Sequence, residues 1–125
     1  MFDLAVDTDP GWVRIITDNF DDFLADHADC ERKASAMVLN LIAKCPDEKS
    51  IIKPLIDLSL EELLHFRQVY ELILKRGLSL NRRMHSDPYV NRLISHCRSG
   101  LEHRLLDKML VLAVVEARGA ERFGI

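Results

Sequence analysis

Two residues in the middle of the chain, Glu62 and His65, have side chains that bind metal ions. On a helix, a spacing of three places them on the same face. Because an ionised carboxylate is costly to bury unless a partner takes up its charge, a metal ion would suit such a pair. Glu-x-x-His on a bundle helix is also the ligand spacing of carboxylate-bridged di-iron sites. Apolar residues recur around the pair at helical spacing and predict that this face is buried: Leu55, Leu58, Phe66, Val69, Leu72 and Ile73.

Two further acids interrupt apolar stripes elsewhere in the chain. Glu31 lies in the middle of a stripe from Phe20 to Ile42, and Glu116 lies in a stripe from Leu105 to Phe123. Three long predicted helices therefore each carry a carboxylate on the face expected to be buried. This matches part of a pattern in which two helices each give a Glu and two others each give Glu-x-x-His. Iron in its +2 and +3 states accepts carboxylate and imidazole ligands.

Each of these residues also has a structural explanation when it is taken alone. Glu31 could pair with an arginine in the core, and His65 could be a hydrogen-bonded interior histidine. Glu116 could pair with Arg118 or Arg122. Isolated Glu-x-x-His matches are common, so it is the combination that favours a metal site.

Two neighbouring acids are weaker candidates. Glu61 falls on a different helical face from Glu62 and is expected to be a surface or outer group. Glu121 could replace Glu116 if the last helix is rotated.

The apolar pattern predicts four helical segments that would position these residues. The first begins near Trp12, or after a break at Thr17-Asp18, and runs to Lys44. The second begins around Asp47-Glu48 and ends at Arg76, with Gly77 as the stop. Pro54 lies in its opening turns, where a proline is either tolerated or kinks the helix.

The remaining two segments follow a polar, basic connection. Pro88 to about Cys97 is a short amphipathic segment. From Leu101 the chain is almost continuously apolar, and its β-branched residues allow a strand. The length and the flanking charges favour a buried helix instead. The predicted fold class is therefore all-α.

Composition is that of one globular domain over residues 1–125, with 48% hydrophobic residues and only five Gly and four Pro. No apolar run approaches the roughly 20 residues that span a membrane, and the N-terminus lacks the basic segment of a signal peptide. These features predict a cytoplasmic protein with no membrane partner. Its three cysteines form no C-x-x-C pair and are predicted to be reduced.

Charge is unevenly spread along the chain. The net charge of −3 argues against wholesale nucleic-acid binding, and residues 1–31 hold nine acids against one arginine. Residues 75–104, by contrast, hold seven bases against two acids. Such a patch could meet a phosphate backbone, although a solvated loop with ordinary surface arginines is an equally good explanation.

Several blocks of sequence resemble one family, the tRNA 2-methylthio-isopentenyladenosine hydroxylases. The resemblance implies a ferritin-like four-helix bundle, of which this chain would hold three long core helices and a short connecting helix. It also implies a non-haem di-iron centre that hydroxylates the isopentenyl group of a modified adenosine beside the tRNA anticodon. Dioxygen and two electrons from a reductase or ferredoxin-like partner would be consumed. The blocks are residues 26–34, 61–69, 76–77, 87–89, 105–107 and 116–123.

Carried over residue by residue, the resemblance makes Glu31, Glu62, His65 and Glu116 the iron ligands, with no catalytic residue beyond them. The family pattern has a second Glu-x-x-His, and no acid after Glu62 has a His three residues on. The domain is therefore expected to be C-terminally incomplete. A bundle that lacks one helix exposes an apolar groove. We expect the chain alone to be inactive or unstable unless a second copy, as in a homodimer, or the missing segment covers this groove.

Four arginines in the basic region are expected to bind tRNA phosphates: Arg82, Arg83, Arg92 and Arg98. One alternative is a ferritin-like iron-binding or iron-oxidising protein without an organic substrate. Another is a metal-free helical interaction module in which the same acids and His65 form a buried hydrogen-bonded network.

Overall fold

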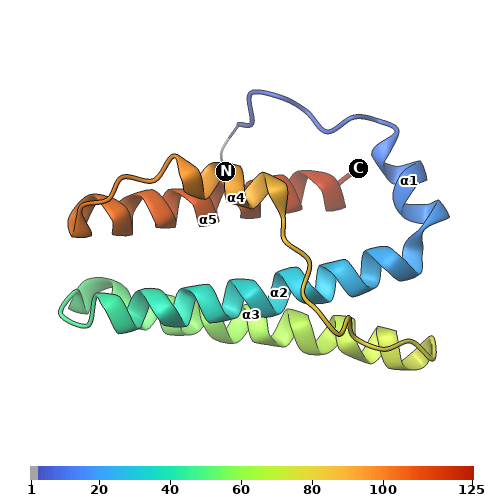
Figure 1. Ribbon diagram of the computed structural model, residues 1–125, viewed down its shortest axis with the longest axis horizontal. Helices are drawn as coiled ribbons and strands as arrows, with labels where there is room; N and C mark the ends of the chain where they lie inside the picture. Colours follow the sequence, from blue (N-terminus) through green and yellow to red (C-terminus); the bar gives the residue numbers. More distant parts are fainter. Residues whose placement is uncertain (1–2) are drawn as a thin grey trace. The chain divides into compact units, whose positions relative to one another are not determined.

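The computed structural model describes residues 3–125, and this part of the chain contains helices and no strand (Figure 1). The all-α prediction is confirmed, including the helix from Leu101. None of these helices is long and apolar enough to span a membrane. The helices are α1 (Trp12–Asp18), α2 (Phe20–Lys44), α3 (Lys49–Lys75), α4 (Pro88–Ser95) and α5 (Leu101–Phe123).

Packing divides the chain into two units. The hairpin unit, Asn19–His85, contains α2 and α3. The α5 unit contains the chain up to Asp18 and Ser86–Ile125, and so holds α1, α4 and α5. The break predicted near Thr17-Asp18 is the boundary between α1 and α2, where Asn19 has a non-helical backbone with φ −131°.

In the hairpin unit, α2 and α3 run antiparallel along one another (Figure 1). Pro54 lies within α3 without ending it. The helix ends where Gly77 takes φ +69°, in the left-handed region that glycine favours. The Gly77 N–H then donates to the carbonyl of Leu74 and the Leu78 N–H to that of Ile73, both at 3.0 Å. This is a Schellman motif, and it confirms the predicted stop.

The core of the hairpin unit is an apolar cluster from both helices, and a polar pair extends the contact beyond it. The Ser35 hydroxyl donates to the carbonyl of Ser59 at 3.0 Å, and the Ser59 hydroxyl donates to the carbonyl of Ser35 at 3.2 Å. Both serines are buried, and their small side chains leave room for the two backbones to approach. The cluster consists of Leu24, Ala28, Val69 and Ile73, with Phe66, Leu78 and Leu80 packed against it.

In the α5 unit, α4 begins with a capping residue and connects to α5 through an ion pair. The Asp87 carboxylate accepts hydrogen bonds from the backbone N–H groups of residues 89 and 90 at 2.8 and 3.2 Å. Arg98 lies between the helices, and its guanidinium forms two bonds with Asp107 at 2.8 and 2.9 Å. Within α5 itself, only Val111 and Leu112 are buried. The prediction of a helix here is right, but the prediction of a buried one is wrong for most of its length.

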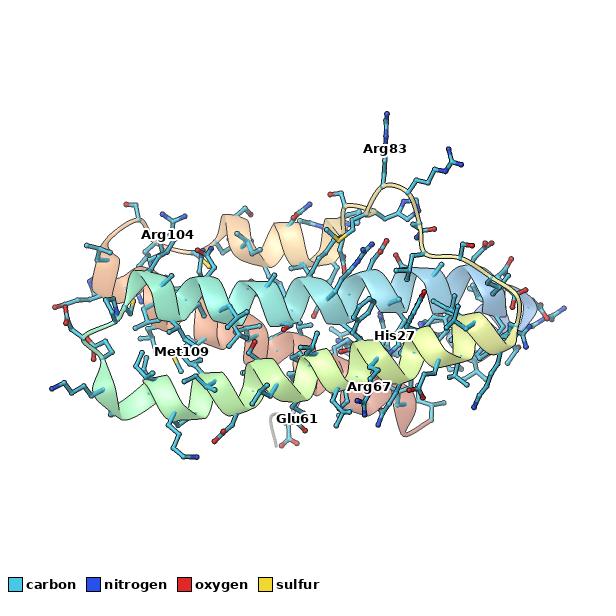
Figure 2. The ribbon with its side chains drawn as sticks, turned by 90° about the horizontal axis from the view of Figure 1, so that it is seen from below. His27, Glu61, Arg67, Arg83, Arg104 and Met109 are labelled. Atoms are coloured by element: carbon cyan, nitrogen blue, oxygen red, sulfur yellow. The ribbon has the colours of Figure 1, made fainter. Side chains whose placement is uncertain are left out.

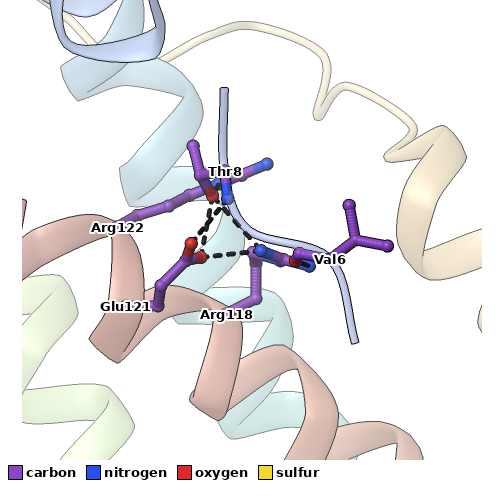
Figure 3. Close-up of polar contacts among 5 residues, drawn as sticks. All are labelled: Val6, Thr8, Arg118, Glu121 and Arg122. Carbon is purple, nitrogen blue, oxygen red and sulfur yellow. Dashed lines mark hydrogen bonds and ion pairs between the residues drawn. The ribbon is translucent and has the colours of Figure 1, made fainter. Parts of the chain in front are cut away.

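The N-terminal segment is attached to α5 by a hydrogen-bonded network around Glu121 (Figure 3). Thr8 donates to the Glu121 carboxylate from its backbone N–H at 2.6 Å and from its hydroxyl at 2.7 Å. Arg118 bonds to Glu121 at 2.7 Å and to the carbonyl of Val6 at 2.7 Å. The hydrogen bonds from Thr8, together with Arg118, lower the pKa of Glu121 from 4.5 to about 2.

This lowered pKa predicts acid sensitivity of the α5 unit. A carboxyl whose pKa is depressed on folding stabilises the fold above its unfolded pKa, and that contribution is lost as the pH falls from 4.5 toward 2. We expect Glu121→Gln to lower the free energy of unfolding at pH 7 and to lessen its fall below pH 4.5, measured by urea unfolding. Glu102→Gln, at an exposed site on the same helix, is the control. Equal pH dependence in the wild type and Glu121→Gln would contradict this prediction.

Candidate metal centre

The hairpin unit brings together Glu31 from α2 with Glu62 and His65 from α3. Each side chain offers one ligand atom, and these atoms lie within 4.8 Å of one another. Glu62 lies on the buried stripe of α3, one turn after Ser59. Glu31 lies one turn before Ser35 on α2, so the hydrogen-bonded serines fix the two helices close to the carboxylates. Three of the four predicted ligands are thus neighbours across the hairpin.

The charges at this place favour a cation. Glu62 is only 4% exposed, and burial raises its pKa from 4.5 to about 7, with a further contribution from the hydrogen bond and the charge of Glu31. Two carboxylates side by side in a buried place repel one another when both are ionised. A metal ion would remove that repulsion and satisfy the oxygens, so two carboxylates and an imidazole fit iron by charge and by donor type.

Glu31 lies between two imidazoles, and one of them was not recognised in the sequence. The Nδ1 atom of His65 is 3.7 Å from Glu31 Oε2, and the Nε2 atom of His27 is 3.1 Å from Glu31 Oε1. His27 stacks on the ring of Phe23 with 5.5 Å between ring centroids. Burial is the main cause that lowers the pKa of His27, and the charge of His65 lowers it further. His27 lies within the apolar stripe from Phe20 to Ile42, and its spacing of four from Glu31 is the signal by which the sequence could have shown it.

The other acids considered from the sequence are not members of this group of three. Glu116 belongs to α5 in the other unit, where it is exposed, and it stays a predicted ligand. Glu61 is exposed on α3, as expected for a surface group. Glu121, the rival of Glu116, is engaged by Thr8 and Arg118.

The four arginines predicted to bind RNA are in different situations. Arg82 and Arg83 are exposed in the connection that follows α3. Arg92 is exposed on α4, where its Nε atom donates to the carbonyl of residue 88 at 3.4 Å. Arg98 is bound to Asp107 through its backbone N–H as well as its guanidinium. A partner of opposite charge already compensates Arg98.

An all-helical chain in which Glu-x-x-His on one helix faces a Glu on its neighbour defines a ferritin-like protein with a potential carboxylate–histidine metal site. The model of the family described as tRNA-(MS[2]IO[6]A)-hydroxylase (MiaE) matches residues 2–125. The chain belongs to this family.

One relative carries the name of this family, and one solved structure has a similar fold. A tRNA 2-(methylsulfanyl)-N(6)-isopentenyladenosine(37) hydroxylase of Pseudomonas putida strain KT2440 is 34% identical over 120 residues, which are 96% of this chain and 58% of that protein. The solved structure of "Protein 43 with aldehyde deformylating oxygenase activity from Synechococcus" matches with a TM-score of 0.92 and 35% identity. The match covers 99% of this chain and 61% of that one. The chain therefore spans about three fifths of the length of both relatives.

Proposed function

We propose that the protein is a non-haem di-iron monooxygenase that hydroxylates the isopentenyl group of 2-methylthio-isopentenyladenosine beside the anticodon of tRNA. One observation carries the proposal. Glu62, which is buried, lies beside Glu31 and His65 in a chain of this hydroxylase family. Its modified nucleoside is the one named for the relative from Pseudomonas putida.

In this proposal Glu31, Glu62 and His65 hold iron, and Glu116 of α5 is a further ligand. Iron, when bound, would supply the activation of dioxygen. Burial of Glu62 keeps water away from its own carboxylate, and exclusion of water protects a reactive centre from side reactions. His27 holds one oxygen of Glu31, leaving the other oxygen on the side of His65.

The proposal also requires partners. The reaction consumes two electrons, so a reductase or ferredoxin-like protein would supply them. The tRNA substrate places the reaction in the cytoplasm. Because bases of an anticodon loop can be splayed out, the modified adenosine can reach a buried centre without opening a duplex. Arg82, Arg83 and Arg92 are the proposed phosphate contacts, and Arg98 is the weakest of the four because Asp107 already binds it.

The test is a single-turnover assay with the purified, iron-loaded protein, at a concentration at which a homodimer can form. It is reduced anaerobically, mixed with tRNA that carries the prenylated nucleoside and exposed to dioxygen, and the digested RNA is analysed by mass spectrometry. We expect a nucleoside heavier by one oxygen atom, labelled when ¹⁸O₂ is used and absent with Glu62→Ala. Iron oxidation without any RNA product would instead favour an iron-oxidising protein without an organic substrate.

A further inference from the structure

The connection after α3 is attached to α2 at two places, on either side of three exposed residues. Before them, the Asn81 side-chain amide donates to Asp29 Oδ2 at 3.0 Å. After them, the His85 N–H donates to the same oxygen at 3.4 Å, and the Lys33 ammonium donates to the His85 carbonyl. The segment between the attachments, residues 82–84, is hereafter the Arg82–Met84 tip.

Asp29, which makes these attachments, is a fully buried carboxylate with 0% exposure. Its other oxygen accepts a hydrogen bond from Arg32 at 2.5 Å. Asn81, Arg32 and His85 thus all donate to this one buried carboxylate. A buried charge is costly unless all its partners are in place. The connection therefore supplies part of what keeps Asp29 satisfied, and Asp29 in return fixes the connection.

The tip presents two adjacent positive charges to solvent. Arg82, Arg83 and Met84 are all exposed, and Figure 2 shows Arg83 pointing away from the ribbon. Within residues 3–125, neither arginine is paired with a carboxylate. Arg76, at the start of the same connection, is by contrast bound to Asp21 at 2.6 Å. Two neighbouring guanidinium groups that form no ion pair within residues 3–125 suit the phosphates of a nucleic acid.

Resting on the proposed tRNA substrate, we propose that the Arg82–Met84 tip contacts the phosphates of tRNA and that Asp29 is the positioning residue that holds this tip. Asp29 precedes Glu31 by two residues on α2, about 3 Å along the helix axis at 1.5 Å per residue. One helix thus carries both the anchor of the RNA-contacting tip and a ligand of the candidate metal centre. This shared helix fixes the distance between RNA phosphates and metal.

The test measures binding of tRNA by fluorescence anisotropy at several salt concentrations, without iron or dioxygen. Each phosphate contact contributes about 0.7 to 0.9 to the slope of log affinity against log salt. The double variant Arg82→Ala/Arg83→Ala should reduce that slope by about 1.5 and weaken binding about tenfold or more at 0.1 M salt. Arg67→Ala, at an exposed arginine on α3, should leave the slope unchanged. An unchanged slope in the double variant would overturn the assignment of the tip.

Asp29→Ala separates positioning from charge. Removing an acid makes the protein more positive, so a purely electrostatic effect would tighten tRNA binding. The positioning role predicts weaker binding and a smaller salt slope, with ferrous-iron affinity unchanged. Asn81→Ala, which removes an attachment without changing charge or breaking the bond between Arg32 and Asp29, should weaken binding in the same direction if Asp29→Ala does not fold. Equal or tighter binding by Asn81→Ala would overturn the positioning role.

The outcomes also distinguish this inference from the proposed function. Wild-type protein that binds no tRNA at any salt concentration would refute the tRNA hydroxylase proposal and the tip together. Wild-type protein that binds tRNA while the double variant binds equally well would refute the tip alone.

Discussion

His65→Ala will bind ferrous iron at least about 100-fold more weakly than the wild type, since loss of an outer partner of a metal ligand already costs about 10- to 100-fold. The imidazole is the nitrogen donor of the group with Glu31 and Glu62, and without it two carboxylates remain. Anaerobic titration followed by metal analysis gives both the affinity and the stoichiometry. Two irons per chain, lost in His65→Ala, would support the di-iron proposal.

The matched control for this experiment is the acid next to Glu62. Glu61→Ala removes one carboxylate from the same turn of α3, but its side chain is exposed and outside the group. Iron affinity should be unchanged in this variant. If His65→Ala binds iron as tightly as Glu61→Ala, His65 is an interior histidine and the metal-site hypothesis fails.

Without metal, the buried carboxyl of Glu62 should make the free energy of unfolding depend strongly on pH. Folding raises the pKa of Glu62 from 4.5 to about 7. At a pH between these two values, the folded protein holds a proton that the unfolded chain has lost. By linkage, the contribution of Glu62 to the free energy of unfolding is largest below pH 4.5 and is lost as the pH rises through 7. Glu62→Gln carries no charge to bury. We expect it to be more stable than the wild type at pH 8 by about 2 kcal/mol, with little difference at pH 4.

Urea unfolding in the presence of EDTA at pH 4 and pH 8 measures this difference. Glu61→Gln, which removes an exposed charge one residue away, should show no such dependence on pH. Because Glu31 hydrogen-bonds to Glu62, the two carboxyls titrate as a pair. Glu62→Gln therefore removes the charge repulsion between them. A gain in stability that is the same at both pH values would count against a buried charge as its cause. The same variant should lose iron, so stability and metal binding make opposite demands on this residue.

The helices could be predicted from the sequence because their signals are local. Gly77 ends α3 because glycine readily takes the left-handed conformation required there. At the start of α4, Asp87 is the capping residue and Pro88 lies in the first turn. The limited burial of α5 could not be predicted in this way. Its apolar residues surround the helix, and periodicity does not say which of them meet a neighbour.

The candidate site was partly visible in the sequence for the same reason. Glu62 and His65 have a recognisable spacing, and Glu31 interrupts an apolar stripe. Asp29 has no such signal, because its partners Asn81 and His85 lie more than 50 residues away. Arg98 was predicted to bind RNA because charge alone was visible, whereas its bond to Asp107 depends on how the connection between α4 and α5 folds.

The buried hydrogen bonds between Ser35 and Ser59 bear on how a metal ion would enter and leave the candidate centre. They hold the helices together next to Glu31 and Glu62 through protein groups alone, so the ligand atoms stay within reach of one another when no ion binds them. In small zinc domains, by contrast, metal binding and folding are one event. The candidate centre would therefore be preorganised, and we expect chelators to remove any bound iron from a hairpin that stays folded and can bind iron again.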